Sequence, residues 1–186
     1  LLGEISTPRR VLLNGRVAEA LEKRYGEKAD ERASRLARHF YESATLTDGH
    51  AEKAIRYSDL AARQAAQQSA WAEATHHYEH CLTLLDAVAR PDSGSEAELL
   101  LSLGTCYRNA NGFRDVWRSL MRATNEFRDQ GDAAGVARAT LEAALVPAPP
   151  EQIKKLTLEA LGFLGNGSPY LEAQLRVAIV SSQGDP

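Results

Sequence analysis

Apolar residues recur every three or four positions through most of this 186-residue chain, and glycine, proline and short polar runs interrupt them. That period is typical of amphipathic helices. It predicts about seven helices and no strand, with Thr7-Pro8 as a helix start and Gly26 as a helix end. The stretches with the clearest period are 7–25, 28–44, 51–67, 70–88, 133–146, 150–164 and 168–180. Polar turns or loops are expected at 45–50, 90–95, 111–112 and 131–132.

Two segments of the chain, Ser58–Cys81 and Leu100–Ala123, carry the same spaced pattern of small, aromatic and apolar residues. With Ala62 and Gly104 taken as the eighth position of a repeat, the later members fall at positions 11, 20, 24 and 27. These are Ala65, Ala74, Tyr78 and Cys81 in the first segment, and Tyr107, Val116, Leu120 and Ala123 in the second. This spacing is the skeleton of a tetratricopeptide repeat, in which antiparallel helix pairs interlock and stack. It predicts an all-α, tetratricopeptide-like right-handed superhelix.

The expected organisation has three parts. Residues 1–48 form an N-terminal helix pair that follows a missing upstream domain, 49–180 form the repeats, and 181–186 are a frayed C-terminus. The chain begins Leu-Leu-Gly without a methionine, so we expect it to be a piece of a longer protein. The repeat phase after residue 132 stays open, because neither Thr140 nor Leu141 is a good small eighth residue.

Composition narrows the classes of partner. The formal net charge is −3, and no basic stretch or apolar run of about 20 residues is present, so we expect no direct nucleic-acid contact and no membrane span. The two cysteines, Cys81 and Cys106, fall at inward positions of the repeats. We therefore expect small buried thiols in a reducing, cytoplasmic setting.

The best candidate for chemistry is a cluster on one predicted helix, made of Glu73, His76, His77, His80 and Cys81. Two histidines four residues apart can chelate zinc, but no second cluster completes a tetrahedral set at recognisable spacing. The favoured interpretation is solvated or hydrogen-bonding histidines, with no metal and no cofactor. Catalytic motifs are also absent from the sequence, so we expect no enzymatic activity.

The other charged candidates are arginines on the second predicted helix. Arg32, Arg35 and Arg38 alternate there with Glu31 and Glu42, which favours a mixed-charge, solvated face.

The remaining candidate surface is the groove formed by the first helix of each repeat. Positions 2, 5, 9, 12 and 13 face the concave side in the repeat geometry that this chain resembles. The candidate binding residues are Arg56, Asp59, Arg63 and Gln67 from the first repeat, and Leu101, Thr105, Arg108 and Asn109 from the second. They are suited to hydrogen-bond an extended peptide or a polyol, and simple solvation of the same residues stays open.

Several stretches, in their order, resemble the helical region that follows the ATPase core of large bacterial signal-transduction ATPases. Those proteins include LuxR-type transcriptional regulators and adenylate-cyclase-associated relatives. The similar stretches are Gly15–Glu22, Ala29–Phe40, Lys53–Tyr57, Ala72–Glu79 and Leu158–Leu175. Asn14 stands where the family commonly has a histidine, and Trp117 and Arg118 replace small residues in the second repeat.

The resemblance implies a cytoplasmic regulatory arm. Such an arm binds a protein partner or a small inducer and restrains the neighbouring ATPase domain, while another domain carries the output. Two alternatives stay open at this point: a free-standing adaptor that binds peptides, and a structural or dimerisation spacer. The ligand, the output domain and the oligomeric state are not determined by the sequence.

Overall fold

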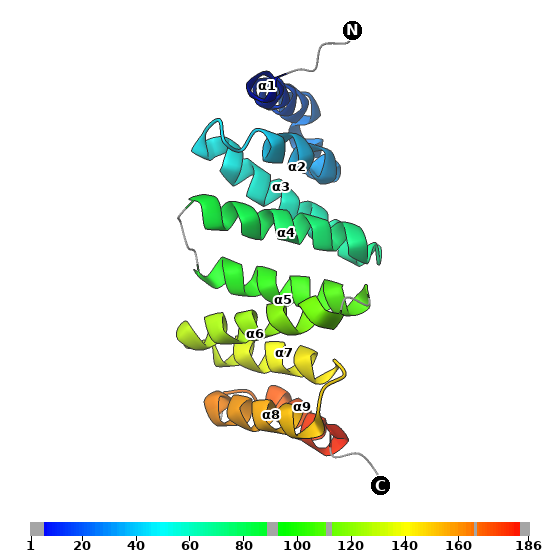
Figure 1. Cartoon of the computed structure of the whole chain (residues 1–186), viewed down its shortest axis with the longest axis vertical. Coiled ribbons are helices and arrows are strands. Elements are labelled where there is room, and N and C mark those ends of the chain that lie inside the picture. The colour runs from blue at the N-terminus through cyan, green and yellow to red at the C-terminus, as the bar shows by residue number, and fades with distance from the viewer. Residues whose placement is uncertain (1–5, 89–92, 111–112, 166, 183–186) are drawn as a thin grey trace. The chain divides into compact units, whose positions relative to one another are not determined.

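The structure is a computed structural model that describes residues 6–88, 93–110, 113–165 and 167–182. Within these residues the chain is helical and has no strand, which confirms the all-α prediction (Figure 1). The α-helices are α1 Thr7–Tyr25, α2 Ala33–Glu42, α3 Asp48–Gln67, α4 Trp71–Val88, α5 Ser93–Asn109, α6 Phe113–Asp129, α7 Ala133–Ala144, α8 Pro150–Leu164 and α9 Pro169–Ser182. None of these helices is long and apolar enough to cross a membrane.

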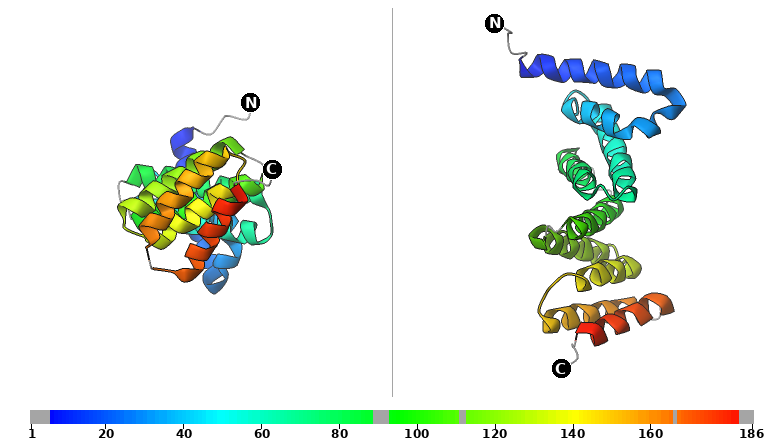
Figure 2. Two further views of the ribbon diagram at one scale, coloured as in Figure 1. Left: turned by 90° about the horizontal axis from the view of Figure 1, so that it is seen from below. Right: turned by 90° about the vertical axis from the view of Figure 1, so that its right-hand side faces the viewer.

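The chain divides into two compact units, Leu1–Pro91 and Asp92–Pro186. In the first unit α1 packs on α2, α2 on α3 and α3 on α4. In the second unit each helix from α5 to α8 packs on the next, and α7 also contacts α5 and α9. The last pair, α8 and α9, runs antiparallel, drawn in orange and red in Figure 2. Each unit is therefore built from neighbouring helices in sequence, as helical repeats are.

Several predicted boundaries were wrong. The predicted number of about seven helices is too low: the described residues form nine α-helices, and the repeat Leu100–Ala123 accounts for two of them. The stretch 28–44 is not one helix: two 3₁₀ turns, Gly26–Lys28 and Asp30–Arg32, precede α2, and such turns commonly connect helices. α3 begins at Asp48, inside the predicted polar turn, because Thr47 caps it by accepting a hydrogen bond from the His50 amide.

Of the other predicted turns and loops, the turn at 131–132 lies within the described residues. Gly131 adopts a φ of +73°, as the expected turn there requires. The expected turn at 111–112 lies outside the described residues, and so does most of the expected loop at 90–95, of which 93–95 belong to α5.

The interlock predicted from the repeat spacing is present in α5 and α6. A Cβ atom placed on Gly104 would lie 2.5 Å from Leu120 Cδ2, and Leu120 is fully buried. Positions 8 and 24 of the repeat therefore meet, and only glycine permits so close an approach. α7 approaches α6 in the same way, because a Cβ on Gly135 would lie 2.3 Å from the Phe127 ring.

A buried trio with spacings of four and three residues recurs on every second helix, including α8 beyond residue 132. Each of its members is buried on α2, α4, α6 and α8 alike. The trios are Ala33, Ala37 and Phe40; Ala74, Tyr78 and Cys81; Val116, Leu120 and Ala123; and Ile153, Thr157 and Ala160. α2 and α8 thus share the spacing of buried residues found in the second helices of the two repeats.

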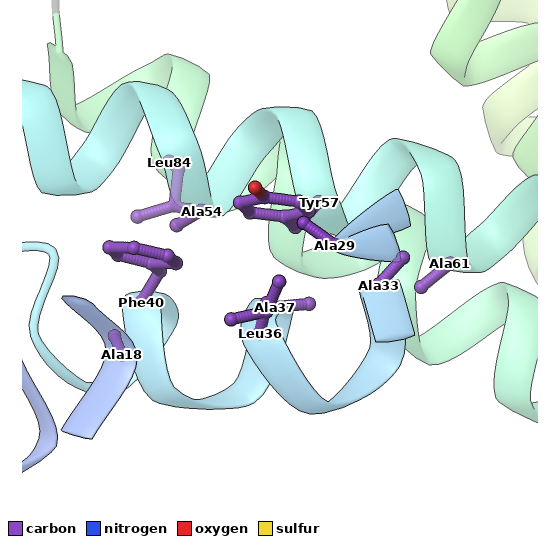
Figure 3. Packing of buried hydrophobic residues seen from close by; sticks show 10 residues of the cluster. All are labelled: Ala18, Ala29, Ala33, Leu36, Ala37, Phe40, Ala54, Tyr57, Ala61 and Leu84. Carbon is purple, nitrogen blue, oxygen red and sulfur yellow. The ribbon is translucent and has the colours of Figure 1, made fainter. Parts of the chain in front are cut away.

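Large aromatic side chains fill the core of the first unit. Phe40 of α2 stacks on Tyr57 of α3 with ring centroids 5.7 Å apart, and both side chains are buried (Figure 3). The Tyr57 hydroxyl donates to Glu22 Oε1 at 2.8 Å, and Lys53 pairs with the same carboxylate at 2.6 Å. Since both partners of Glu22 come from α3, this network ties α1 to α3 across α2.

Candidate binding groove

The predicted binding residues of α3 lie in the first unit and are largely engaged with neighbouring side chains. Arg56 pairs with Asp30 at 2.7 Å, and Arg63 pairs with Asp59 at 2.8 Å. Gln67 is exposed at the end of the helix. Two of the four residues that were expected to offer hydrogen bonds to a ligand are thus cations already neutralised by a carboxylate.

The predicted binding residues of α5 lie in the second unit and face α7. Arg108 reaches Glu142 of α7 through two nitrogens, at 3.0 and 3.1 Å. Asn109 donates to the carbonyl of Thr105, whose hydroxyl donates to the carbonyl of Leu101. Leu101 and Thr105 line a groove, while Arg108 and Asn109 are held beside it by these bonds.

The groove has a volume of about 710 Å³ and lies among α5, α7 and α9. Its α9 residues recur at intervals of three and four from Tyr170 to Ser181, so one whole face of α9 is turned toward it. The large apolar residues that line it are Leu101, Leu141, Leu145, Tyr170, Leu171 and Val177. The groove therefore offers mainly apolar contact surface.

Local structure explains why α9 presents this face. Leu175 points inward and is fully buried, where it anchors α9 to the rest of the unit. Tyr170 and Val177 line the groove and are 71% and 63% exposed, and Leu145 at the end of α7 is 63% exposed. Since large apolar side chains are usually buried, a cluster of three around one groove marks a surface suited to a partner.

Two arginine–glutamate pairs join α5 to α7 beside the groove. Arg138 binds both oxygens of Glu98, at 2.6 and 3.2 Å, and this hydrogen bonding raises the pKa of Arg138. In the pair Arg108–Glu142 the arginine lies on α5 and the glutamate on α7, the reverse of the pair Arg138–Glu98. The charges cancel locally, so the groove has no strong preference for an anion or a cation.

The histidine cluster on α4 is packed with aromatic neighbours. The His80 ring stacks on the Tyr41 ring of α2 with centroids 3.7 Å apart. The centroids of the His76 and His80 rings are 4.0 Å apart. Burial, with the neighbouring imidazoles, lowers the pKa of His80 to about 4, and burial also lowers the pKa of His77. Among the described residues no group of three or more His, Cys, Asp or Glu side chains is arranged to hold a metal ion.

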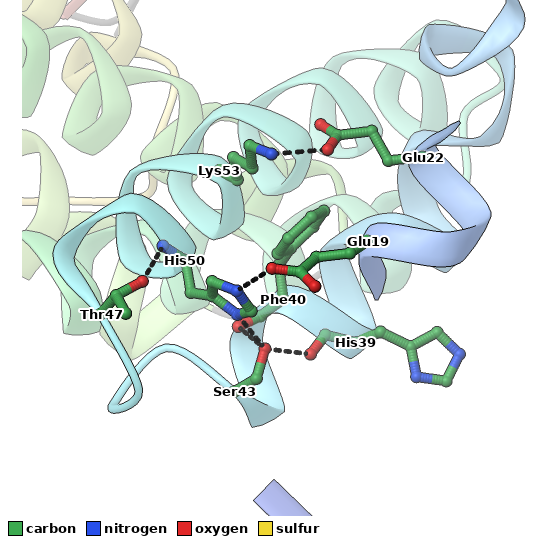
Figure 4. A network of polar contacts seen from close by, with 8 residues as sticks. All are labelled: Glu19, Glu22, His39, Phe40, Ser43, Thr47, His50 and Lys53. Atoms are coloured by element: carbon green, nitrogen blue, oxygen red, sulfur yellow. Dashed lines mark hydrogen bonds and ion pairs between the residues drawn. The ribbon is translucent and has the colours of Figure 1, made fainter. Parts of the chain in front are cut away.

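A serine, a histidine and a carboxylate also meet in the first unit. The Ser43 hydroxyl lies 2.8 Å from His50 Nδ1, and His50 Nε2 lies 3.2 Å from Glu19 Oε1 (Figure 4). Ser43 is fully buried and also donates toward the carbonyls of His39 and Phe40. A nucleophile must reach its substrate, so this network joins α1, α2 and α3 rather than forming an acyl-transfer site.

Both cysteines are free and buried, as predicted. Burial raises the pKa of the Cys81 thiol to about 12 and that of Cys106 to about 11. A thiol becomes nucleophilic when its pKa is lowered, so these positions favour packing over reactivity.

The sequence identified only the α5 wall of the groove. The α7 and α9 walls were missed because they lie beyond residue 132, where the repeat phase was open. The exposed apolar spacing of Tyr170 and Val177 on a helix was the available signal.

In comparisons with known proteins, no protein-family model and no curated protein sequence matches the chain.

Proposed function

We propose that this chain works by noncovalent recognition and that the groove of α5, α7 and α9 binds the apolar face of a helical segment of a partner protein. The observation that carries the proposal is the cluster of exposed Leu145, Tyr170 and Val177 around an apolar groove. An amphipathic helix that lies in such a groove uses apolar anchors at intervals of three, four and seven residues.

The length of the groove favours a helix over a small inducer. Its α9 wall runs from Tyr170 to Ser181, which at 1.5 Å per residue corresponds to about 17 Å. That length matches about three turns of a bound helix. The neutralised pairs Arg138–Glu98 and Arg108–Glu142 leave specificity to shape and apolar contact.

Burial of the exposed side chains would contribute a substantial part of the binding free energy. A fully buried Leu, Val or aromatic side chain contributes about 1.5–3 kcal/mol relative to an exposed one. Three such anchors offset part of the free-energy cost of association and of ordering the partner. The loss of one anchor would weaken the affinity by about tenfold or more.

A selection experiment tests this proposal. A displayed library of amphipathic helical peptides is enriched on the wild-type chain and then assayed on Val177→Asp and Leu158→Asp. Leu158 is the matched control, because it is 51% exposed on α8 and does not line the groove. We expect binders that lose affinity with Val177→Asp and keep it with Leu158→Asp.

Equal loss with both variants, or no enrichment at all, would refute the proposal. Sedimentation of the chain without peptide tests for self-association through the same groove. If the chain forms a dimer that Val177→Asp dissociates, the result would support a dimerisation arm instead.

We also propose that the chain is the helical-repeat arm of a cytoplasmic bacterial signal-transduction ATPase of the LuxR or adenylate-cyclase-associated type. The order of the similar stretches, Gly15–Glu22 to Leu158–Leu175, supports this. The test is the sequence of the complete gene, which should encode a Walker A motif upstream; a complete reading frame without one contradicts the parentage and leaves groove binding intact.

A further inference from the structure

A second concave surface lies entirely in the first unit, on the side of α2 that carries its arginines. It is a polar hollow of about 830 Å³, a size typical of sites for small metabolites. The end of α1 contributes Tyr25 to its wall and α3 contributes Gln64, whose amide donates to the carbonyl of Asp30 at 2.9 Å. The other lining residues are Glu31, Arg32, Ser34, Arg35, Arg38 and His39.

The three arginines of this hollow are exposed and, within the part of the chain that the structure describes, form no ion pair. This sets them apart from later arginines. From Arg56 onward, every arginine whose side chain is described is paired with an acid. Among the described residues, the carboxylates of Glu31 and Glu42, which the sequence places among the three arginines, form no ion pair with them.

The positive charge of the hollow is therefore only partly offset. Three guanidinium groups and the single carboxylate of Glu31 leave a formal charge of +2 on its lining. His39 adds no charge: its pKa is lowered by burial and then by Arg38 and Arg35. His39 Nδ1 is 2.8 Å from Asn14 Oδ1, an oxygen that only accepts, so the neutral ring is held with its proton on Nδ1.

We propose that this hollow binds a small molecule through a phosphate group held by Arg32, Arg35 and Arg38. A guanidinium offers a planar fork of donors that matches phosphate oxygens. A phosphate monoester carries a charge of about −1.5 to −2 near pH 7, which balances the lining. This site is separate from the groove, which lies in the other unit, so neither proposal depends on the other.

Nucleic acid is the competing ligand. A nucleic-acid surface needs an extended basic stripe that follows the backbone, whereas these arginines line a single hollow that also holds the carboxylate of Glu31. A hollow of about 830 Å³ with a carboxylate in its lining favours a single phosphate-bearing molecule.

Calorimetry with inorganic pyrophosphate as the probe tests the proposal. The proteins are the wild-type chain, Arg35→Gln/Arg38→Gln, and the control Arg9→Gln/Arg10→Gln. The control removes the same charge from exposed α1 arginines that do not line the hollow. Neither double variant touches the core, and circular dichroism checks that both fold.

We expect saturable binding at one site, weakened about tenfold to a hundredfold in Arg35→Gln/Arg38→Gln and by no more than about twofold in the control. Equal weakening in both variants would show diffuse attraction and overturn the proposal. So would the absence of saturable heat at millimolar pyrophosphate. Binding of a short single-stranded DNA, without binding of pyrophosphate, would replace it with a nucleic-acid surface.

Discussion

The contact between Gly104 and Leu120 gives the sharpest test of the repeat packing. In Gly104→Ala the new Cβ would lie 2.5 Å from Leu120 Cδ2 and 2.7 Å from its Cγ. Leu120 is fully buried and has little room to move away. Either α5 and α6 separate slightly or Leu120 leaves its preferred rotamer, and both responses raise the energy of the folded state.

The magnitude follows from two opposing effects. Overpacking of a core costs about 1–3 kcal/mol, whereas replacing a mid-helix glycine with alanine stabilises a helix by about 1 kcal/mol. Gly104→Ala should therefore lower the free energy of unfolding by up to about 2 kcal/mol. Gly162→Ala on α8 is the matched control, because nothing lies within 4 Å of its new Cβ. That change should stabilise the chain by up to about 1 kcal/mol.

Urea denaturation followed by circular dichroism measures both effects, and a double-mutant cycle isolates the contact. Leu120→Ala alone should cost about 2–5 kcal/mol because it leaves a cavity. In that background the obstruction is gone, so Gly104→Ala should become stabilising. The reasoning is refuted if Gly104→Ala stabilises the chain as much as Gly162→Ala does, or if its effect is the same with and without Leu120.

Three further predictions concern titration, thiols and a helix cap. The pKa values of His77 and His80 are lowered in the folded state, so their contribution to the free energy of unfolding is present above pH 6.5 and is lost as the pH falls toward 4, by up to about 3 kcal/mol for His80. His80→Gln should flatten the dependence of the free energy of unfolding on pH, measured by denaturation across that range. An unchanged slope in this variant would contradict the prediction. Because burial raises their pKa values to about 12 and about 11, Cys81 and Cys106 should react with a thiol reagent at pH 8 only after unfolding, and rapid labelling of the native chain would count against their burial. Asp132→Ala removes the cap that accepts from the Gly135 amide at 2.9 Å and should cost about 1 kcal/mol in thermal unfolding, while no change would show that the cap is dispensable.

The helical fold could be predicted because its signals are local. The small residue at Gly104 and the apolar residue at Leu120 are parts of one short pattern, and the structure brings them together. The 3₁₀ turns before α2 could not be foreseen, since Ala29–Phe40 has an unbroken helical period.

The binding surfaces were harder to predict because they depend on pairings between distant residues. Arg108 was expected to be free for a ligand, but Glu142, 34 residues away in the sequence, neutralises it. The reverse holds for Arg35 and Arg38: the sequence predicts that nearby acids pair with them, but among the described residues neither arginine forms an ion pair. A one-dimensional charge pattern does not determine which carboxylate reaches which guanidinium.

The most direct test of groove recognition is a map of backbone amide chemical shifts of the isotope-labelled chain, titrated with a helical peptide selected on it. The account predicts that the shifts concentrate on α5, α7 and α9 around Leu101, Leu145 and Val177, and that they vanish in Val177→Asp. Shifts centred on Leu158 and the exposed face of α8, or spread over the first unit, would contradict it.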